Sequence, residues 1–367
     1  MIVVVFIILT IYIICIGILI FGFTKMKRFS HDDNTENKTS FSIVVPFRNE
    51  AENLPKLLHT ISLLNYPKEL FEVILVDDAS DDNYKITHYD FSITLLNNQR
   101  KSGSPKKDAI EAAIQIAKHN WIITTDADCL VQKNWLSAID QYIQQGNKKM
   151  VAAGVCYLPQ RGLLHAFQNL DFMSLQGATI GSFGIDKPFM CNGANFAYEK
   201  SFFEQLNGFE GNETIASGDD VFLLQKVILQ NKKAVGYCMN PESIVATKSE
   251  DSWVKLFQQR IRWAAKSTSY SSTFGKVLAL IVFTTNLVWI CVFLFWLIGQ
   301  FDQNYFILFI GSKFLIDYIL LHQTASYFKT KLHWVFISSQ LYPFFSTLVA
   351  LNALLGNYTW KGRKFKQ

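Results

Sequence analysis

The chain lacks the short motifs by which many nucleotide-binding and metal-binding proteins are identified. No G-x-G-x-x-G follows its first Val-rich run and no G-x-x-x-x-G-K-[ST] occurs, which argues against a dinucleotide enzyme or a P-loop ATPase. The six cysteines are scattered without a C-x-x-C pair, and no His/Cys cluster suggests zinc. Cys15 and Cys291 lie inside long apolar runs, and we expect reduced thiols.

Charge is also scarce, because charged residues make up 18% of the 367 residues whereas hydrophobic residues make up 50%. Such a chain is too apolar for an ordinary soluble domain, and its middle is too polar for a membrane bundle. We expect one globular domain between membrane segments. The net charge of +5 gathers beside apolar segments, so anionic lipid is the expected partner and nucleic acid is not.

The N-terminal segment predicts a membrane anchor. Residues 1–23 carry no charged side chain, and Lys25, Lys27 and Arg28 come directly after them. A stretch of this length spans the hydrocarbon layer as a helix, and its basic flank places the next part of the chain in the cytoplasm. A cleaved secretory signal would have a shorter apolar run with charged residues before it, and this chain has neither feature. We therefore predict a signal anchor over 1–24 and a linker over 25–40.

The C-terminal part of the chain, residues 276–356, predicts further membrane segments. The candidates are residues 276–299, 305–322 and 334–355. The first link has no Lys or Arg, whereas the second carries Lys329 and Lys331, which fits an outside and then an inside link. Three full crossings would leave the basic tail, residues 357–367, outside. Pro343 allows a broken or re-entrant last segment instead, and both alternatives stay open. The expected location is an inner or plasma membrane, with the globular domain cytoplasmic.

Residues 41–250 predict an α/β domain. Apolar runs at 41–46, 71–78, 92–96 and 121–128 alternate with helix-like segments at 50–64 and 106–118. This alternation predicts a mostly parallel sheet covered on both faces, which binds ligands beyond the carboxyl ends of its strands. The polar side chains at the carboxyl ends of these runs are Arg48, Asn49, Glu50, Asp77, Asp78, Asp126 and Asp128.

The pair Asp126 and Asp128 predicts a metal site. Residues two apart on an extended chain point to the same side, so the two carboxylates would converge without a basic neighbour. A hard cation, Mg²⁺ or Mn²⁺, resolves the repulsion and prefers carboxylates together with phosphate oxygens. Without a phosphate loop, a nucleotide diphosphate held by metal and side chains is the expected ligand. The alternative is that each Asp serves only a turn or a helix cap.

Two later segments offer further candidates. Asp219 and Asp220 open a helical pattern, where Ser217 or Asp219 can cap the helix or one Asp can act as a general base. Residues 251–275 form an amphipathic basic pattern typical of the membrane interface. Within it, Gln259 and Arg262 share a face, Arg262 could hold a phosphate, and Trp263 could stack on a sugar.

In this order the motifs resemble those of family 2 glycosyltransferases with a GT-A fold. They are most similar to the membrane-integrated branch with ceramide glucosyltransferase and the hyaluronan, chitin and cellulose synthases. The segments that carry the resemblance are VVPFRNE, VDDASDD, TTDADC, CNGANF, SGDD and QRIRW. The chain departs from the family pattern at PKKDAI, where G-K-x-x-A-L is common, and at Asp219, where Glu is usual.

The resemblance implies a role for each matching residue. The residues implied in nucleotide-sugar binding are Pro46, Arg48, Glu50, Asp78, Lys106 and Asp126. Asp126 and Asp128 are implied as metal ligands, and Asp220, with Asp219 beside it, as the catalytic base. The residues implied at the acceptor end and the diphosphate are Asn192, Gly193, Gln259, Arg262 and Trp263.

The expected function is therefore that of an inverting, Mn²⁺- or Mg²⁺-dependent glycosyltransferase. It would move a sugar from a nucleotide-diphosphate sugar, such as a UDP-sugar, to a lipid-linked or membrane-associated glycan acceptor. One alternative is a processive polysaccharide synthase, which the small number of C-terminal segments disfavours. The other is a membrane-anchored scaffold that binds sugar nucleotides without catalysis.

Overall fold

The computed structural model describes residues 1–30, 35–146, 148–213, 215, 218–266, 269–355, 358–360 and 363–365. The chain divides into two compact units, which are described separately. The sheet unit comprises Lys27–Leu158 and Met190–Lys248, and the helical unit comprises Met1–Met26, Pro159–Phe189 and Ser249–Gln367. Ser217, part of the predicted linker and part of the basic tail lie outside the described residues.

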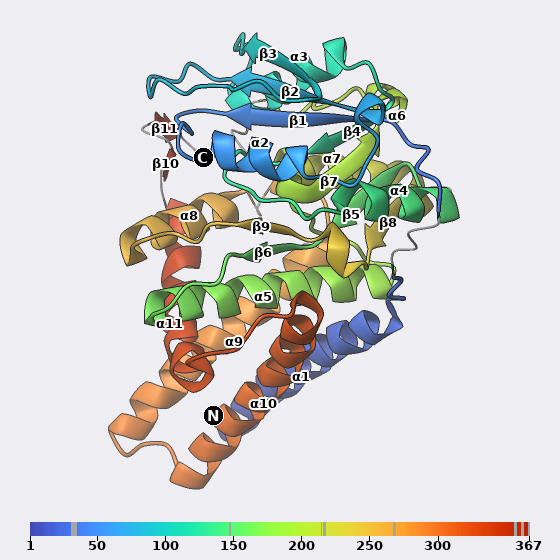
Figure 1. The fold of residues 1–367 in the computed structure, drawn as a ribbon. Helices are drawn as coiled ribbons and strands as arrows, with labels where there is room; N and C mark the ends of the chain where they lie inside the picture. The colour runs from blue at the N-terminus through green and yellow to red at the C-terminus, as the bar shows by residue number, and fades with distance from the viewer. Residues whose placement is uncertain are drawn as a thin grey trace. The chain divides into compact units, whose positions relative to one another are not determined.

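The sheet unit is built on a seven-stranded sheet (Figure 1). Its strands are β1 (Phe41–Phe47), β2 (Phe71–Asp77), β3 (Ser92–Asn97), β4 (Trp121–Thr124), β5 (Met150–Ala153), β7 (Phe196–Glu199) and β8 (Val235–Cys238). They lie in the order β3-β2-β1-β4-β7-β5-β8, and only β7 runs antiparallel to its two neighbours. The predicted mostly parallel α/β sheet is therefore confirmed.

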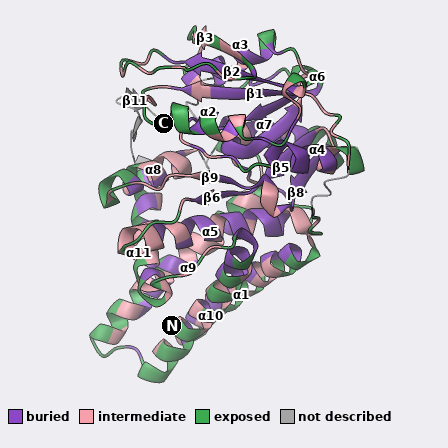
Figure 2. Cartoon of the chain, viewed as in Figure 1, coloured by how far each residue is buried: buried purple, intermediate pink, exposed green. Residues whose placement is uncertain are grey.

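The runs of Val and Ile form strands because both faces of the sheet are covered. Every residue of β2, β4, β5 and β8 is buried, and these strands are drawn in purple in Figure 2. The edge strand β3 has exposed residues, whereas β8 at the other edge of the sheet is buried. A second, two-stranded sheet pairs β6 (Val155–Tyr157) with β9 (Val245–Thr247) in parallel.

The main helices of the sheet unit are α2 (Leu54–Ser62), α3 (Pro105–Ile116), α4 (Trp135–Gln145), α6 (Lys200–Gln205) and α7 (Asp219–Asn231). Short 3₁₀ turns lie at Lys68–Leu70, Gly193–Asn195, Lys232–Ala234 and Pro241–Ser243. Helix α2 begins later than its pattern predicted, because residues 48–53 form a turn before Leu54 and Pro55 occupies the first helical turn.

The helical unit contains α1 (Ile2–Lys25), α5 (Leu163–Gly184), α8 (Trp253–Ala265), α9 (Thr273–Leu297), α10 (Gln303–Phe328) and α11 (Val335–Leu355). In the described chain, α1, α9 and α10 are long and apolar enough to cross a membrane. Helix α11 continues through Pro343, so the break considered there does not occur. In the predicted basic tail, Tyr358–Trp360 (β10) pairs antiparallel with Arg363–Phe365 (β11).

Helix α5 leaves the predicted 41–250 domain and joins the helical unit. It packs against α1 at a very short distance, because glycines line the contact. A Cβ at Gly184 would lie 1.8 Å from the carbonyl oxygen of Gly22, and one at Gly181 would lie 2.3 Å from that of Leu19. Only glycine permits this approach of two helix backbones. The sequence prediction of one uninterrupted domain missed this contact because it forms between distant segments.

Candidate functional site

The turns after β1 and β2 are joined at the carboxyl edge of the sheet. Arg48 Nη1 donates to the carbonyl oxygens of Asp78 and Ala79, both at 2.9 Å. The Asp78 carboxylate in turn accepts hydrogen bonds from Arg100 Nε at 2.7 Å and from Asn98 Nδ2 at 2.9 Å. The structure therefore brings Arg48 and Asp78 together, as predicted from strand ends that meet at one edge.

The neighbouring acidic and polar residues have local partners. Glu50 accepts a hydrogen bond from Asn53 at 2.6 Å in the turn after β1, and Pro46 lies within β1 itself. Asp77 Oδ1 accepts the backbone N–H of Ser80 at 2.9 Å and so closes the turn after β2. Of the two adjacent acids, Asp77 thus stabilises the turn, whereas Asp78 pairs with Arg100.

Asp126 and Asp128 lie in a turn rather than on a strand. Strand β4 ends at Thr124, and the N–H of Cys129 donates to the carbonyl oxygen of Asp126 at 3.1 Å. The prediction from extended-chain geometry is therefore wrong for these two residues, because the strand stops before them. Asp128 Oδ2 accepts a hydrogen bond from Thr247 Oγ1 at 3.2 Å, which ties the turn to β9.

The expectation that this acidic pair has no basic neighbour is also wrong. Lys106, in the first turn of α3, places its Nζ 2.8 Å from Asp126 Oδ1 and 3.6 Å from Asp219 Oδ2. Burial lowers the pKa of Lys106, but the carboxylates of Asp126 and Asp219 outweigh this effect and raise the pKa above its ordinary value. The lysine therefore stays charged and links the turn after β4 to the start of α7.

Asp219 and Asp220 begin helix α7, directly after Gly218. Gly218 occupies the N-cap position with φ 84°, so Asp219 is the first helical residue and not the cap that one of the two interpretations allowed. Acidic residues in this turn are favoured by the helix dipole. The two acids have different partners. Asp219 pairs with Lys106, whereas Asp220 accepts a hydrogen bond from Gly193 in the loop before β7.

The carboxylate of Asp220 is held by two backbone N–H groups. Its Oδ2 accepts from Gly193 and its Oδ1 from Val221, both at 2.8 Å. The carbonyl oxygen of Gly193 accepts from Thr124 Oγ1 at 2.7 Å, so the same residue also contacts β4. Asn192 caps this 3₁₀ turn through a bond from the N–H of Ala194 at 3.0 Å. The predicted residues Gly193 and Asp220 are therefore direct partners.

A buried lysine beside this cluster was missed by the sequence interpretation. Lys107 Nζ donates to the carbonyl oxygens of Asn212 at 2.6 Å and Ile215 at 3.0 Å, and lies 4.9 Å from the centre of the Phe222 ring. Burial lowers the pKa of Lys107 to about 8, although Asp219 and Asp220 oppose this shift. The signal in the sequence is a second lysine directly after Lys106, in the first turn of the helix.

The remaining predicted residues, Gln259, Arg262 and Trp263, lie on α8 in the helical unit. Gln259 Nε2 donates to Glu250 Oε1 at 2.8 Å, and the Trp263 ring lies 6.0 Å from that of Phe172. The helix ends at Ala265, so the predicted amphipathic segment 251–275 is longer than the helix that forms.

The acidic turn is chemically suited to a hard divalent cation. No group of three His, Cys, Asp or Glu side chains gathers within the part of the chain that the structure describes. Asp126 and Asp128 could supply two carboxylate oxygens, and the other ligands would come from phosphate and water. Mg²⁺ and Mn²⁺ bind such a ligand set. The half-exposed side chain of Asp126 leaves one face open to such ligands.

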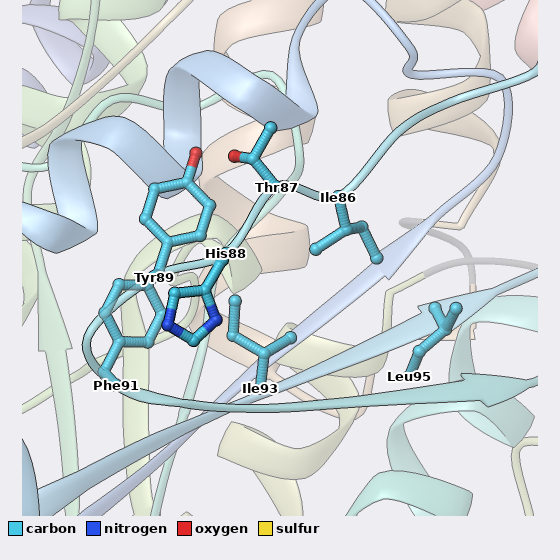
Figure 3. Close-up of a pocket in the computed structure, with 7 residues that line it drawn as sticks. All are labelled: Ile86, Thr87, His88, Tyr89, Phe91, Ile93 and Leu95. Carbon is cyan, nitrogen blue, oxygen red and sulfur yellow. The ribbon is translucent and has the colours of Figure 1, made fainter.

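A hollow of about 350 Å³ lies elsewhere, beside the edge strand β3 (Figure 3). Its lining residues are Ile86, Thr87, His88, Tyr89, Phe91, Ile93 and Leu95. None of the predicted site residues lines it, and most of its lining precedes β3, away from the carboxyl ends of the strands. We therefore place the candidate site at the acidic edge and not in this hollow.

The sheet order and the polar carboxyl edge define a GT-A-type α/β fold. A mannosyltransferase of Pyrobaculum calidifontis, solved with GDP-Man and Mn²⁺, has the same fold at a TM-score of 0.56. The alignment covers 94% of this chain and 99% of that chain, with 18% sequence identity. Residues 42–206 match Glycosyl transferase family 2.

Two curated relatives are also similar to this chain. The chain is 25% identical over 243 residues to the probable glycosyltransferase YdaM of Bacillus subtilis, covering 63% of this chain and 56% of the relative. It is 22% identical over 262 residues to the poly-beta-1,6-N-acetyl-D-glucosamine synthase of Staphylococcus epidermidis, covering 68% and 60%. The chain thus spans less than two thirds of the length of these two relatives.

Proposed function

We propose that the protein is an inverting glycosyltransferase that uses a nucleotide-diphosphate sugar, with a UDP-sugar as the expected donor. The observation that carries the proposal is the arrangement of Asp220. Two backbone N–H groups orient its carboxylate, while Lys106 joins the adjacent Asp219 to Asp126. A fixed carboxylate next to a cluster that can bind a diphosphate is the arrangement that this reaction requires.

In the proposed reaction, Asp220 takes the proton of an acceptor hydroxyl. The hydroxyl oxygen forms a bond to the anomeric carbon as the bond from that carbon to the diphosphate oxygen breaks, and the diphosphate leaves with the electron pair. Attack opposite the leaving group inverts the anomeric configuration. Lys106 holds positive charge near the departing diphosphate, and Asp78 with Arg48 and Glu50 binds the nucleotide.

Asp126 and Asp128 would hold Mn²⁺ or Mg²⁺. When bound, such an ion neutralises the negative charge that develops on the leaving diphosphate. We further propose that Gln259, Arg262 and Trp263 contact the diphosphate and the acceptor end, together with Asn192 and Gly193.

We propose a lipid-linked or membrane-associated glycan as the acceptor, and a multi-pass location in an inner or plasma membrane with the sheet unit in the cytoplasm. The support is the presence of three helices in the described chain that are long and apolar enough to cross a membrane. The basic residues Lys25, Lys27 and Arg28 at the end of α1 and directly after it favour this orientation.

The test uses the full chain in detergent with Mn²⁺, a panel of nucleotide sugars and membrane lipid extract, with diphosphate release as the measurement. We expect one donor to be turned over, more rapidly with the extract than without it. Asp220→Asn should lower the rate by about 10²–10⁴-fold and leave donor binding nearly unchanged. Equal turnover by this variant would contradict the proposed base, and a non-catalytic scaffold predicts no turnover by either protein.

The alternative, a processive polysaccharide synthase, is distinguished by product length, and the staphylococcal relative is named a synthase. Single transfer predicts a product of one added sugar on a gel or by mass spectrometry at all donor concentrations. A ladder of long products that appears before the acceptor is consumed would contradict single transfer and support the synthase.

A further inference from the structure

The segment QRIRW contains a second arginine that the motif does not assign. Arg260 is one of the few residues of α8 that are buried, with 5% of its surface exposed. A guanidinium in such a place is costly unless it is paired and hydrogen-bonded. Its partners therefore indicate why the helix tolerates a charge there.

Arg260 is paired across helices within the helical unit. Its Nε lies 2.5 Å from Asp171 Oδ2 on α5, and both side chains are more than nine-tenths buried. The neighbouring Gln168 of α5 exchanges two bonds of 2.8 Å with the backbone of Glu250. Helix α5 thus anchors both the start of α8 and its buried arginine.

The same guanidinium contacts two of the motif residues on its own helix. Arg260 Nη1 donates to the side-chain oxygen of Gln259, and its Cζ lies 4.2 Å from the centre of the Trp263 ring. The amide of Gln259 is held at its other end by Glu250, and Trp263 also packs against Phe172. One planar cation therefore restrains the side chains of both Gln259 and Trp263.

We propose that Arg260, held by Asp171, is a positioning residue that orients Gln259 and Trp263 for their contacts with the diphosphate and the acceptor. The inference rests on the proposed function for those two residues. A lysine could keep the charge and the pairing with Asp171. It could not reach the amide and cover the indole ring at the same time, because its charge is a compact point on a flexible chain.

The kinetic test compares Arg260→Lys and Asp171→Asn in the full chain with wild type. We expect each variant to lower kcat about 10- to 100-fold with a smaller change in the donor KM, because misplaced groups lose catalytic orientation before they lose nucleotide binding. The double variant should lose little more than either single one, since both changes disrupt one unit. Lys255→Met is the matched control, because Lys255 lies on α8 and its partner Asp251 is exposed. Additive losses, or a wild-type kcat in Arg260→Lys, would overturn the proposal.

A second readout does not depend on turnover. The chain contains eight Trp, and ¹⁹F spectra of protein labelled with 5-fluorotryptophan, assigned by Trp263→Phe, isolate the Trp263 resonance. We expect Arg260→Lys to shift and broaden this resonance while Lys255→Met leaves it unchanged. An unchanged Trp263 resonance in Arg260→Lys refutes the positioning role even if the proposed transferase reaction holds. If wild type turns over no donor, the proposed function fails while the spectra still decide whether Arg260 orders Trp263.

Discussion

Replacing Lys106 by Met should affect metal binding and sugar transfer in opposite directions. Without a donor, the ammonium lies 2.8 Å from Asp126 Oδ1, so a cation that binds Asp126 must displace it or share the carboxylate with it. With a donor bound, the same ammonium is expected to stabilise the diphosphate. Lys106→Met should therefore strengthen binding of Mn²⁺ alone and weaken transfer.

The separations in the structure set the size of the effect. At an effective dielectric constant of about 20, charges 2.8 and 3.6 Å apart attract each other by roughly 5 kcal/mol each. The Asp126 side chain is 40% exposed, so solvent reduces the net contribution. We expect about 2 kcal/mol to remain, which corresponds to an about thirtyfold lower Kd for Mn²⁺.

The assay titrates the full chain in detergent with Mn²⁺ and monitors free Mn²⁺ by electron paramagnetic resonance. Diphosphate release with donor and acceptor should fall about 10- to 100-fold in the same variant. Lys133→Met is the control, because Lys133 is exposed shortly after the acidic turn and the change removes the same charge. Equal or weaker Mn²⁺ binding by a folded Lys106→Met protein would refute the reasoning.

Three further changes test other contacts of the sheet unit. A Cβ at Gly193 would lie 3.0 Å from Asp219 Oδ2, so Gly193→Ala should displace Asp219 and Asp220 and lower kcat about tenfold. An unchanged kcat would count against Asp220 as the proposed base. Asp78→Asn should raise the donor KM about tenfold with kcat nearly constant, measured by steady-state kinetics, and a change confined to kcat would disagree with nucleotide binding. Lys107 has a pKa of about 8 in the folded protein and about 10.4 in the unfolded chain. Between these pH values the unfolded chain binds more protons, so the free energy of unfolding should rise with pH. This contribution amounts to about 3 kcal/mol, and thermal unfolding from pH 7 to 10 should show a smaller rise for Lys107→Met; identical profiles would contradict it.

The sequence predicted the first four strands of the seven-stranded sheet, and the edge at which polar residues gather, because both depend on local patterns. Buried parallel strands require continuous apolar runs, and β1 and β2 begin and end within one residue of the predicted bounds. The residues directly after them meet at one edge for topological reasons, as Arg48 and Asp78 do. The motif resemblance then selected Asp220 from an acidic pair that local patterns left ambiguous.

Other features could not be predicted from the sequence, since they depend on contacts between distant segments. Lys106 reaches Asp126 and Asp219 only because α3, the turn after β4 and the start of α7 meet in space. Local periodicity also gave no sign that Arg260 pairs with Asp171 across 89 positions, or that the glycines of α5 admit α1.

Composition and hydrophobic periodicity alone determined that this protein combines an α/β sheet with long apolar helices, because burial of apolar surface dictates both patterns. Tertiary structure alone decided which charges face each other, since an ion pair forms between side chains brought together by folding and leaves no fixed spacing in the chain.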